Sequence, residues 1–224
     1  MRIAVCMTLV PRNEEVFVHR ATGKLRAEPT LVNPADENAL ELALTLRDAR
    51  GAEVVAVSCG GDANEAMLRK AIALGCEHAY HLKDERLAGS DPLATARILG
   101  EALKRIKPDV SFFGSEGPDG GQTGPRVAEY LGVPHIIEAI AVDMGEPPHV
   151  KRIREGEEET RALNLPALLA VRPGINNLRT PKAVQIIRAH REGVLTAWSM
   201  SDLGLDESQV GVRGSSTRIV ELFE

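Results

Sequence analysis

The chain has 224 residues, and its 27 lysines and arginines stand against 32 aspartates and glutamates, for a formal net charge of −5. This balance argues against broad binding to nucleic acid or to an acidic membrane surface, and the 3% aromatic content leaves few rings on which bases could stack. No apolar run reaches the roughly 18 residues of a membrane helix, and the N-terminus has no signal-peptide layout. We therefore expect a cytoplasmic protein with no nucleic-acid partner and no direct insertion into a membrane.

The N-terminal stretch predicts a central strand followed by a hairpin. Residues 2–10 form a nearly continuous apolar run that ends at Pro11, which is typical of a strand covered on both faces. Residues 16–19 and 29–32 are predicted to be strands of a hairpin excursion around a turn at 22–24.

Helices and buried strands are then predicted to alternate. Helices are expected at 34–50, 62–74 and 92–106, and strands at 53–58, 79–82 and 109–113. The N-caps are assigned to Asn33, to Asp62 in a capping box with Glu65, and to Asp91. Alternation at this spacing implies a parallel sheet with right-handed crossovers and helices on both faces, which is a doubly wound α/β fold of three αβα layers.

A small antiparallel excursion is predicted to interrupt this alternation at about residues 135–166. Its strands are placed at 136–144, 150–153 and 159–165. An apolar run from Leu163 to Val171 then predicts a return to the main sheet.

The last part of the chain carries a cationic segment and a polar tail. Residues 172–191 contain five lysines and arginines and no acidic residue, within a chain that is acidic overall. Such a segment is either an exposed helix end or a docking surface, and we favour docking. The tail has few apolar anchors and can pack on a partner or fray. We divide the chain into an α/β domain over 1–198 and a C-terminal tail over 199–224.

The most informative stretch is the glycine-rich loop from Gly114 to Pro125. It follows a predicted buried strand, precedes a predicted helix, and contains five glycines that allow close approach of the backbone and positive φ angles. The helix N-terminus would direct its unpaired N–H groups at an anion. The alternative is a flexible surface loop.

Ligands of doubly wound sheets bind at the carboxyl ends of the strands, near the switch in strand order. The strand ends at 8–11, 58–60 and 114–124 and the helix entry at 33–37 would converge there. We expect the backbone N–H groups of 121–124 to bind phosphate, with side-chain donors from Gln122 and Thr123. Asp36 and Asp119 are candidates for ribose hydroxyls, although each is equally typical of a cap or turn. No set of residues suggests catalysis.

The cysteines and histidines predict neither a metal nor a redox centre. Cys6 and Cys59 lie in apolar runs where a buried, reduced thiol is common, and together with Cys76 they lack metal-type spacing. The six histidines are scattered, so no metal site is predicted.

Several motifs, in this order, resemble the β subunits of electron-transferring flavoproteins. The matching pieces are Asn33-Pro34-x-Asp36-Glu37, Ala56-Val57-Ser58-Cys59-Gly60, Leu68-Arg69-Lys70-Ala71, Asp119 with Gln122-Thr123-Gly124, Leu163-x-Leu165-Pro166-Ala167, and Asn176-x-x-Arg179. The resemblance covers essentially the whole chain and implies a fold like that of the adenine-nucleotide α-hydrolases. It also implies a heterodimer with an α subunit that carries FAD, on which the C-terminal tail packs.

In this family the β subunit holds a second adenine nucleotide. The binding positions that the resemblance implies are Cys6, Asn33, Asp36, Cys59, Gly60, Gly114, Asp119, Gly121, Gln122, Thr123 and Gly124. The nucleotide is AMP in ordinary members and a second FAD in the electron-bifurcating and nitrogen-fixation-associated branch. Residues 88–95 and 214–217 resemble the second branch, whereas 122–124 resemble the first. Thr8 and Ser115 occupy positions where the family commonly has lysine.

The resemblance also assigns the cationic segment to partner docking. Ala183 aligns with the leucine by which ordinary members recognise dehydrogenases, and Arg179, Lys182 and Gln185 surround it. We expect an electron-carrier subunit, not an enzyme on its own, whose partner is an acyl-CoA dehydrogenase or a quinone- or ferredoxin-linked oxidoreductase. The alternative is a stand-alone adenine-nucleotide-binding protein or an ATP-using enzyme of similar fold. The absence of a Ser-Gly-Gly-x-Asp-Ser loop at residues 8–13 counts against an ATP pyrophosphatase.

Overall fold

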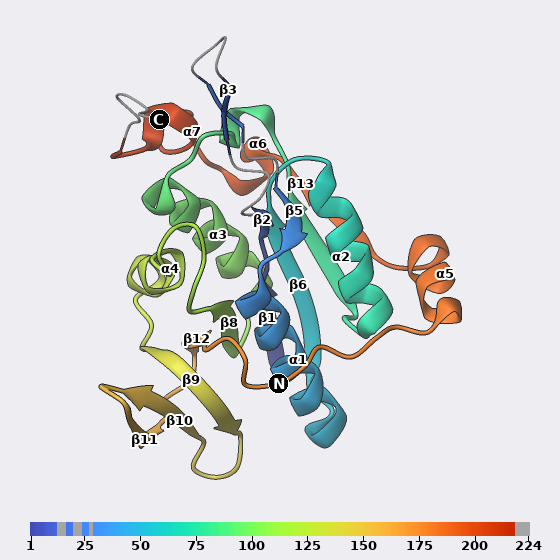
Figure 1. Ribbon diagram of the computed structural model, residues 1–224, viewed down its shortest axis with the longest axis vertical. Helices are drawn as coiled ribbons and strands as arrows, with labels where there is room; N and C mark the ends of the chain where they lie inside the picture. The colour runs from blue at the N-terminus through green and yellow to red at the C-terminus, as the bar shows by residue number, and fades with distance from the viewer. Residues whose placement is uncertain (13–16, 20–23, 27–28, 218–224) are drawn as a thin grey trace.

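A nine-stranded sheet forms the middle layer of the computed structural model, which describes residues 1–12, 17–19, 24–26 and 29–217 (Figure 1). The strand order is β11-β10-β9-β12-β8-β1-β6-β7-β13. The strands are β1 (Arg2–Cys6), β6 (Glu53–Cys59), β7 (His78–Leu82), β8 (Val110–Gly114), β9 (His135–Asp143), β10 (His149–Arg154), β11 (Glu157–Ala162), β12 (Ala167–Val171) and β13 (Leu195–Trp198). The seven strands β9, β12, β8, β1, β6, β7 and β13 run parallel to one another. The other two, β10 and β11, are antiparallel and form the excursion beside β9. The predicted doubly wound fold is confirmed.

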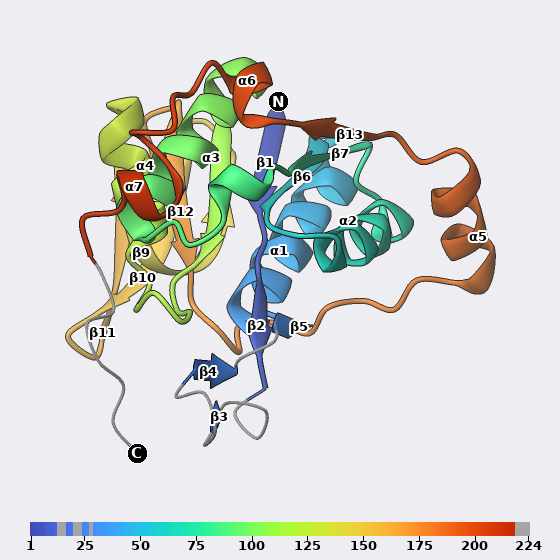
Figure 2. The ribbon, with the colours of Figure 1, turned by 90° about the horizontal axis from the view of Figure 1, so that it is seen from above.

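Helices cover both faces of the sheet, as the continuous apolar strands require. One face packs against α1 (Pro34–Arg50) and α2 (Ala63–Leu74), with Val54 and Phe112 among the buried side chains. The other packs against α3 (Pro92–Ile106), α4 (Thr123–Leu131) and α6 (Met200–Leu203). The helix α5 (Ala183–Arg191) packs on α2 and stands at the edge of the molecule farthest from β11 (Figure 2).

The strand order places a switch point between β1 and β8. From β1 the chain builds outward through β6 and β7, and α3 then returns it to the other side of β1 to form β8 and β12. The two connections therefore diverge at the carboxyl ends of β1 and β8, which is where doubly wound folds leave a crevice.

The predicted strand over residues 2–10 is divided in two. After Cys6 the N–H group of Thr8 donates to the Asp36 carboxylate at 2.8 Å, which removes it from the ladder. The chain then leaves the sheet, and β2 (Leu9–Pro11) pairs with β5 (Pro29–Val32). A separate ladder joins β3 (Phe17–His19) to β4 (Lys24–Arg26), while Val16 and most of the turn expected at 22–24 lie outside the described residues.

Other local predictions need correction. Asp62 is itself in helical conformation and makes no side-chain cap, because its carboxylate is paired with Lys83 instead, so the capping box with Glu65 is wrong. Asp91 does cap α3, accepting a hydrogen bond from the N–H of Ala94 at 2.9 Å.

The C-terminal part of the chain contains more structure than its composition predicted. The edge strand β13 pairs in parallel with β7. Beyond it, α6 and α7 (Gly211–Gly214) follow, and the side chains of Met200, Leu203 and Val210 are buried in the chain's own core. The tail therefore packs on this domain at least as far as Thr217, and its packing on a partner subunit stays a prediction.

Candidate functional site

A cavity of about 370 Å³ opens at the carboxyl ends of β1 and β8, at the switch point. Its walls come from the chain after β1, the start of α1, the start of α3 and the loop from β8 into α4. Apolar side chains, including Leu9, Leu99 and Phe113, share these walls with polar groups. The volume lies within the range of small-molecule sites, roughly 300–1,000 Å³.

Asp36 joins the two strand ends below the cavity. Its Oδ2 accepts from the N–H of Thr8 and its Oδ1 from the N–H of Gly114, both at 2.8 Å. Asp36 lies in the first turn of α1, from which its side chain reaches both strand ends. With only 4% of its surface exposed, Asp36 fixes the cavity floor through these two hydrogen bonds, and its contact with a ribose stays a prediction.

The surroundings of Asp36 oppose its ionisation. Burial raises the pKa of its carboxyl group to about 7, and the hydrogen bonds from Thr8 and Gly114 only partly counteract this effect. The group therefore titrates close to neutral pH while it holds the two strand ends together.

Asp119 organises the glycine-rich loop in the same way. Its carboxylate accepts from the N–H groups of Gly121 at 3.0 Å and Thr123 at 2.7 Å. Gly121 has a φ of +72°, and a Cβ there would lie 2.1 Å from the carbonyl oxygen of Ser115, so the loop folds on itself closely enough to require glycine. Two of the four N–H groups predicted to meet phosphate are thus already paired with Asp119.

The loop leaves other donors without a protein acceptor. Within the described residues, neither the N–H of Gly124 nor the hydroxyl of Thr123 donates to the protein, and both residues line the cavity. Unpaired N–H groups at a helix N-terminus favour an anion. The Oγ of Ser115, at a position where lysine was expected, is buried and has no partner among the described residues.

Most of the predicted cofactor-binding residues meet at this cavity. Those that line it are Cys6, Asn33, Asp36, Cys59, Gly114, Asp119, Thr123 and Gly124. Asn33 does not cap α1 with its side chain as predicted, and its Nδ2 donates to the carbonyl of Glu116 at 2.8 Å, which ties the loop to α1.

Gly60, Gly121 and Gln122 do not line the cavity. The carbonyl of Gly60 lies 3.0 Å from Nε2 of the buried His81, and the side-chain oxygen of Gln122 accepts from Arg126 at 2.9 Å. Gln122 therefore supports the helix α4 and does not reach the cavity.

The start of α3 contributes wall residues that were not predicted to bind a ligand. Ser90, Pro92, Thr95 and Leu99 line the cavity opposite the glycine-rich loop. The sequence held two signals: the Asp91-Pro92 helix start, which fixes where α3 begins, and the resemblance of residues 88–95 to the branch that holds a second FAD.

The cavity thiols are poor nucleophiles. Burial raises the pKa of Cys59 to about 12 and that of Cys6 well above its ordinary value, where the nearby Asp36 adds to the effect. In the part of the chain that the structure describes, no three His, Cys, Asp or Glu side chains lie close enough to hold a metal ion. The described helices include none long and apolar enough to cross a bilayer. The cavity is equipped to bind a ligand and shows no nucleophile–base pair.

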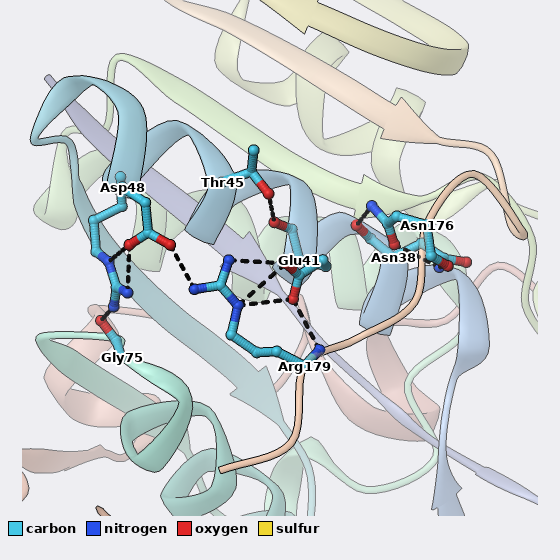
Figure 3. A network of polar contacts seen from close by, with 8 residues as sticks. Asn38, Glu41, Thr45, Asp48, Gly75, Asn176 and Arg179 are labelled. Carbon is cyan, nitrogen blue, oxygen red and sulfur yellow. Dashed lines mark hydrogen bonds and ion pairs between the residues drawn. The ribbon is translucent and has the colours of Figure 1, made fainter. Parts of the chain in front are cut away.

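The predicted docking segment is held against α1 along its first half (Figure 3). Arg179 forms a multiple hydrogen-bonded ion pair with Glu41, including Nη2 to Oε1 at 2.8 Å, and its Nη1 reaches Asp48 at 2.6 Å. Asn38 and Asn176 exchange hydrogen bonds between side chain and backbone at 2.7 and 3.0 Å. Arg179 therefore anchors the segment, and its charge is not free for docking.

The second half of the segment is exposed. Lys182, Ala183 and Gln185 lie at the start of α5, where the side chain of Gln185 accepts from the N–H of Lys182 at 2.7 Å. Val184 is 74% exposed and Ile187 is 53% exposed, one helical turn apart. The buried Ala189 is the contact of α5 with the domain. The free surface of this segment is apolar as well as cationic.

A parallel sheet wound in both directions from β1, with a cavity at its switch point, defines a doubly wound α/β protein whose cavity lies where such folds bind ligands. The model of the electron transfer flavoprotein domain matches residues 25–202. The chain belongs to the electron transfer flavoprotein family, among its β subunits.

Relatives of known name support this assignment. The electron transfer flavoprotein subunit beta of Thermoanaerobacterium thermosaccharolyticum is 34% identical over 225 residues, covering 98% of this chain and 86% of that protein. Protein FixA of Azorhizobium caulinodans is 35% identical, covering 100% of this chain and 84% of FixA. The caffeyl-CoA reductase–Etf complex subunit CarD of Acetobacterium woodii is 32% identical, with coverages of 100% and 87%.

Proposed function

We propose that this chain pairs with an FAD-bearing α subunit, binds an adenine nucleotide in the switch-point cavity, and acts as an electron-carrier subunit. The observation that carries the proposal is the pairing of apolar walls with unpaired donors at the N-terminus of α4. Apolar walls suit an adenine ring, and the donors suit a phosphate.

The residues that line the cavity can bind such a ligand without an additional charged side chain. Thr123 and Gly124 would donate to a phosphate, while Asp36 and Asp119 hold the backbone that presents them. The nucleotide is AMP or the AMP portion of a second FAD, because a cavity of about 370 Å³ suits a mononucleotide better than a complete dinucleotide. A bound flavin would supply the redox chemistry, and this chain would orient it and exclude water.

We assign docking of the redox partner to the exposed surface of α5. Val184 lies one helical turn from Arg188, which pairs with Glu192, and Lys182 precedes the helix, so this surface combines an apolar anchor with cationic side chains. Positive charge at the rim would steer an acidic partner, and transient redox complexes need little buried area. A dehydrogenase or a quinone- or ferredoxin-linked oxidoreductase would occupy this surface.

Ligand stoichiometry tests the proposal. The chain would be co-purified with its α subunit, denatured to release the ligands, and the released FAD and AMP counted per heterodimer. We expect either one FAD with one AMP, or two FAD. A heterodimer without an adenine nucleotide in this subunit would overturn the proposal. ATP turnover by the chain alone would favour the stand-alone enzyme.

A further inference from the structure

The segment Gly211–Thr217, called the strap here, lies across the beginning of α3 (Figure 1). It does not itself line the cavity, but it contacts the stretch Gly89–Thr95, which contributes Ser90, Pro92 and Thr95 to the cavity wall. The strap and the ligand site therefore share one piece of backbone.

Asp91 is the centre of this contact. One carboxylate oxygen, Oδ1, caps α3 through the N–H of Ala94. The other, Oδ2, accepts four hydrogen bonds from the strap: from the N–H and hydroxyl of Ser216 at 2.7 and 2.8 Å, and from the N–H and hydroxyl of Thr217 at 3.0 and 3.1 Å. Burial opposes ionisation of this carboxyl group, yet these hydrogen bonds hold its pKa well below the usual range.

Further contacts join the strap to the same wall. The hydroxyl of Ser215 donates to the carbonyl of Gly211 at 2.7 Å and accepts from the N–H of Asp91 at 2.8 Å. The N–H of Gly211 donates to the hydroxyl of Ser90 at 2.8 Å. Gly89 leaves no room for a side chain, because a Cβ there would lie 2.7 Å from Val212. The wall stretch is thus hydrogen-bonded and packed against the strap at its first three residues, Gly89 to Asp91, where it enters α3.

We propose that the strap fixes the Ser90–Thr95 wall of the cavity, so that Asp91 is a positioning residue and strap docking and ligand binding strengthen each other. A wall held in its binding geometry before the ligand arrives lowers the entropy cost of binding. Linkage requires the reverse effect as well, so a ligand against this wall holds the strap more firmly. The inference rests on the proposed nucleotide function of the cavity.

The variant Asp91→Asn separates the two roles of this residue. Asparagine is as good an N-cap as aspartate, so α3 keeps its cap. The amide nitrogen that replaces Oδ2 is a donor, and it faces the four donors of the strap. Asp202→Asn is the matched control, because Asp202 likewise accepts from the N–H and hydroxyl of a serine, Ser199, on the exposed side of α6 and away from the cavity.

The experiment measures hydrogen exchange of residues 211–217 and the dissociation constants of AMP and FAD, titrated separately, in the nucleotide-stripped heterodimer. We expect AMP or FAD to slow exchange in the strap of the wild type. In Asp91→Asn the strap should exchange faster and the dissociation constant should rise at least tenfold, while Asp202→Asn matches the wild type. The double variant Ser216→Ala/Thr217→Val, which keeps the carboxylate, should show a smaller change in the same direction.

The outcomes that contradict the proposal are distinct. Faster strap exchange in Asp91→Asn with unchanged affinity would show that the strap does not position the wall. Unchanged exchange would show that Asp91 does not hold the strap. A wild-type heterodimer that binds neither nucleotide would reject the proposed function and with it the coupling between strap and ligand. In that case, hydrogen exchange in Asp91→Asn would still show whether Asp91 holds the strap in place.

Discussion

The glycine-rich loop and the cationic segment both stand out in the sequence, but the folded protein uses their polar groups in opposite ways. In the loop, Asp119 pairs with part of the backbone, and donors at Thr123 and Gly124 are left open to the cavity. In the segment, the most prominent charge, Arg179, is paired with Glu41 and Asp48. The exposed part of that segment is α5, which carries apolar side chains beside its cationic ones.

This difference shows that an unusual local composition does not identify free functional groups. The acidic residues that pair with Arg179 lie on α1, more than a hundred residues earlier in the chain, so the segment looks cationic only when it is considered alone. In the loop, Gly120 and Gly121 serve a local conformational role through their positive φ angles, whereas the N–H of Gly114 donates to Asp36 on the same helix α1. Three changes test this contrast.

The largest expected effect concerns Asp36 and pH. The folded-state pKa of Asp36, about 7, lies above the value near 3.8 of an exposed carboxyl group. Between these pH values the folded protein therefore keeps a proton on Asp36 that the unfolded chain has released. The contribution of Asp36 to the free energy of unfolding is fully present below about pH 4. It is lost as the pH rises to about 7, by up to about 1.4 kcal/mol per pH unit.

Urea unfolding at pH 5 to 8 checks this expectation. The advantage of the wild type over Asp36→Asn should shrink as the pH rises, since asparagine cannot titrate. Glu37→Gln is the control, because Glu37 pairs with Lys70 at the surface and should leave the pH dependence unchanged. If the free energies of unfolding of the wild type and Asp36→Asn changed equally with pH, the raised pKa of Asp36 would be contradicted.

The second effect concerns the close approach within the loop. Gly121→Ala places a Cβ 2.1 Å from the carbonyl oxygen of Ser115, at a φ of +72°. Gly120→Ala meets nothing closer than 3.8 Å at a nearly equal φ of +68°, so it carries the cost of backbone conformation alone. We expect Gly120→Ala to lose about 1 kcal/mol and Gly121→Ala about 2 kcal/mol more in the free energy of unfolding. Equal losses would mean that the loop is not closely packed.

The third effect concerns the anchored half of the segment. Arg179→Ala leaves the mostly buried Glu41 without its partner and should destabilise the protein by about 1–3 kcal/mol. Arg188→Ala, which removes an exposed pair with Glu192 on α5, should cost less than about 0.5 kcal/mol. Chemical denaturation compares the two variants, and an Arg179→Ala protein as stable as Arg188→Ala would return Arg179 to the list of docking candidates.

The sequence was sufficient for the architecture because the fold depends on local patterns. Apolar runs gave the central strands, and Asp91-Pro92 gave the start of α3 correctly. What failed depended on distant partners. The strand after Cys6 ends early because Asp36, from the next helix, removes Thr8 from the ladder. Asp62 pairs with Lys83 rather than capping its helix.

The candidate site was predicted in part for the same reason. The topological rule brought the strand ends and the glycine-rich loop to one crevice, and the structure contains a cavity there. The rule could not indicate that Asp119 pairs with two loop N–H groups, that Gln122 bonds to Arg126, or that α3 supplies the opposite wall. These depend on side-chain directions that a one-dimensional pattern does not contain.

The central claim is that the switch-point cavity, and not the docking segment, holds the nucleotide. Its most direct test is the nucleotide content of heterodimers that carry Thr95→Phe, which fills the cavity from its partly buried α3 wall, or Val184→Asp, which alters the exposed face of α5. With unfolding curves like that of the wild type, we expect loss of this subunit's nucleotide in Thr95→Phe and full content in Val184→Asp. Full content in both variants would contradict it.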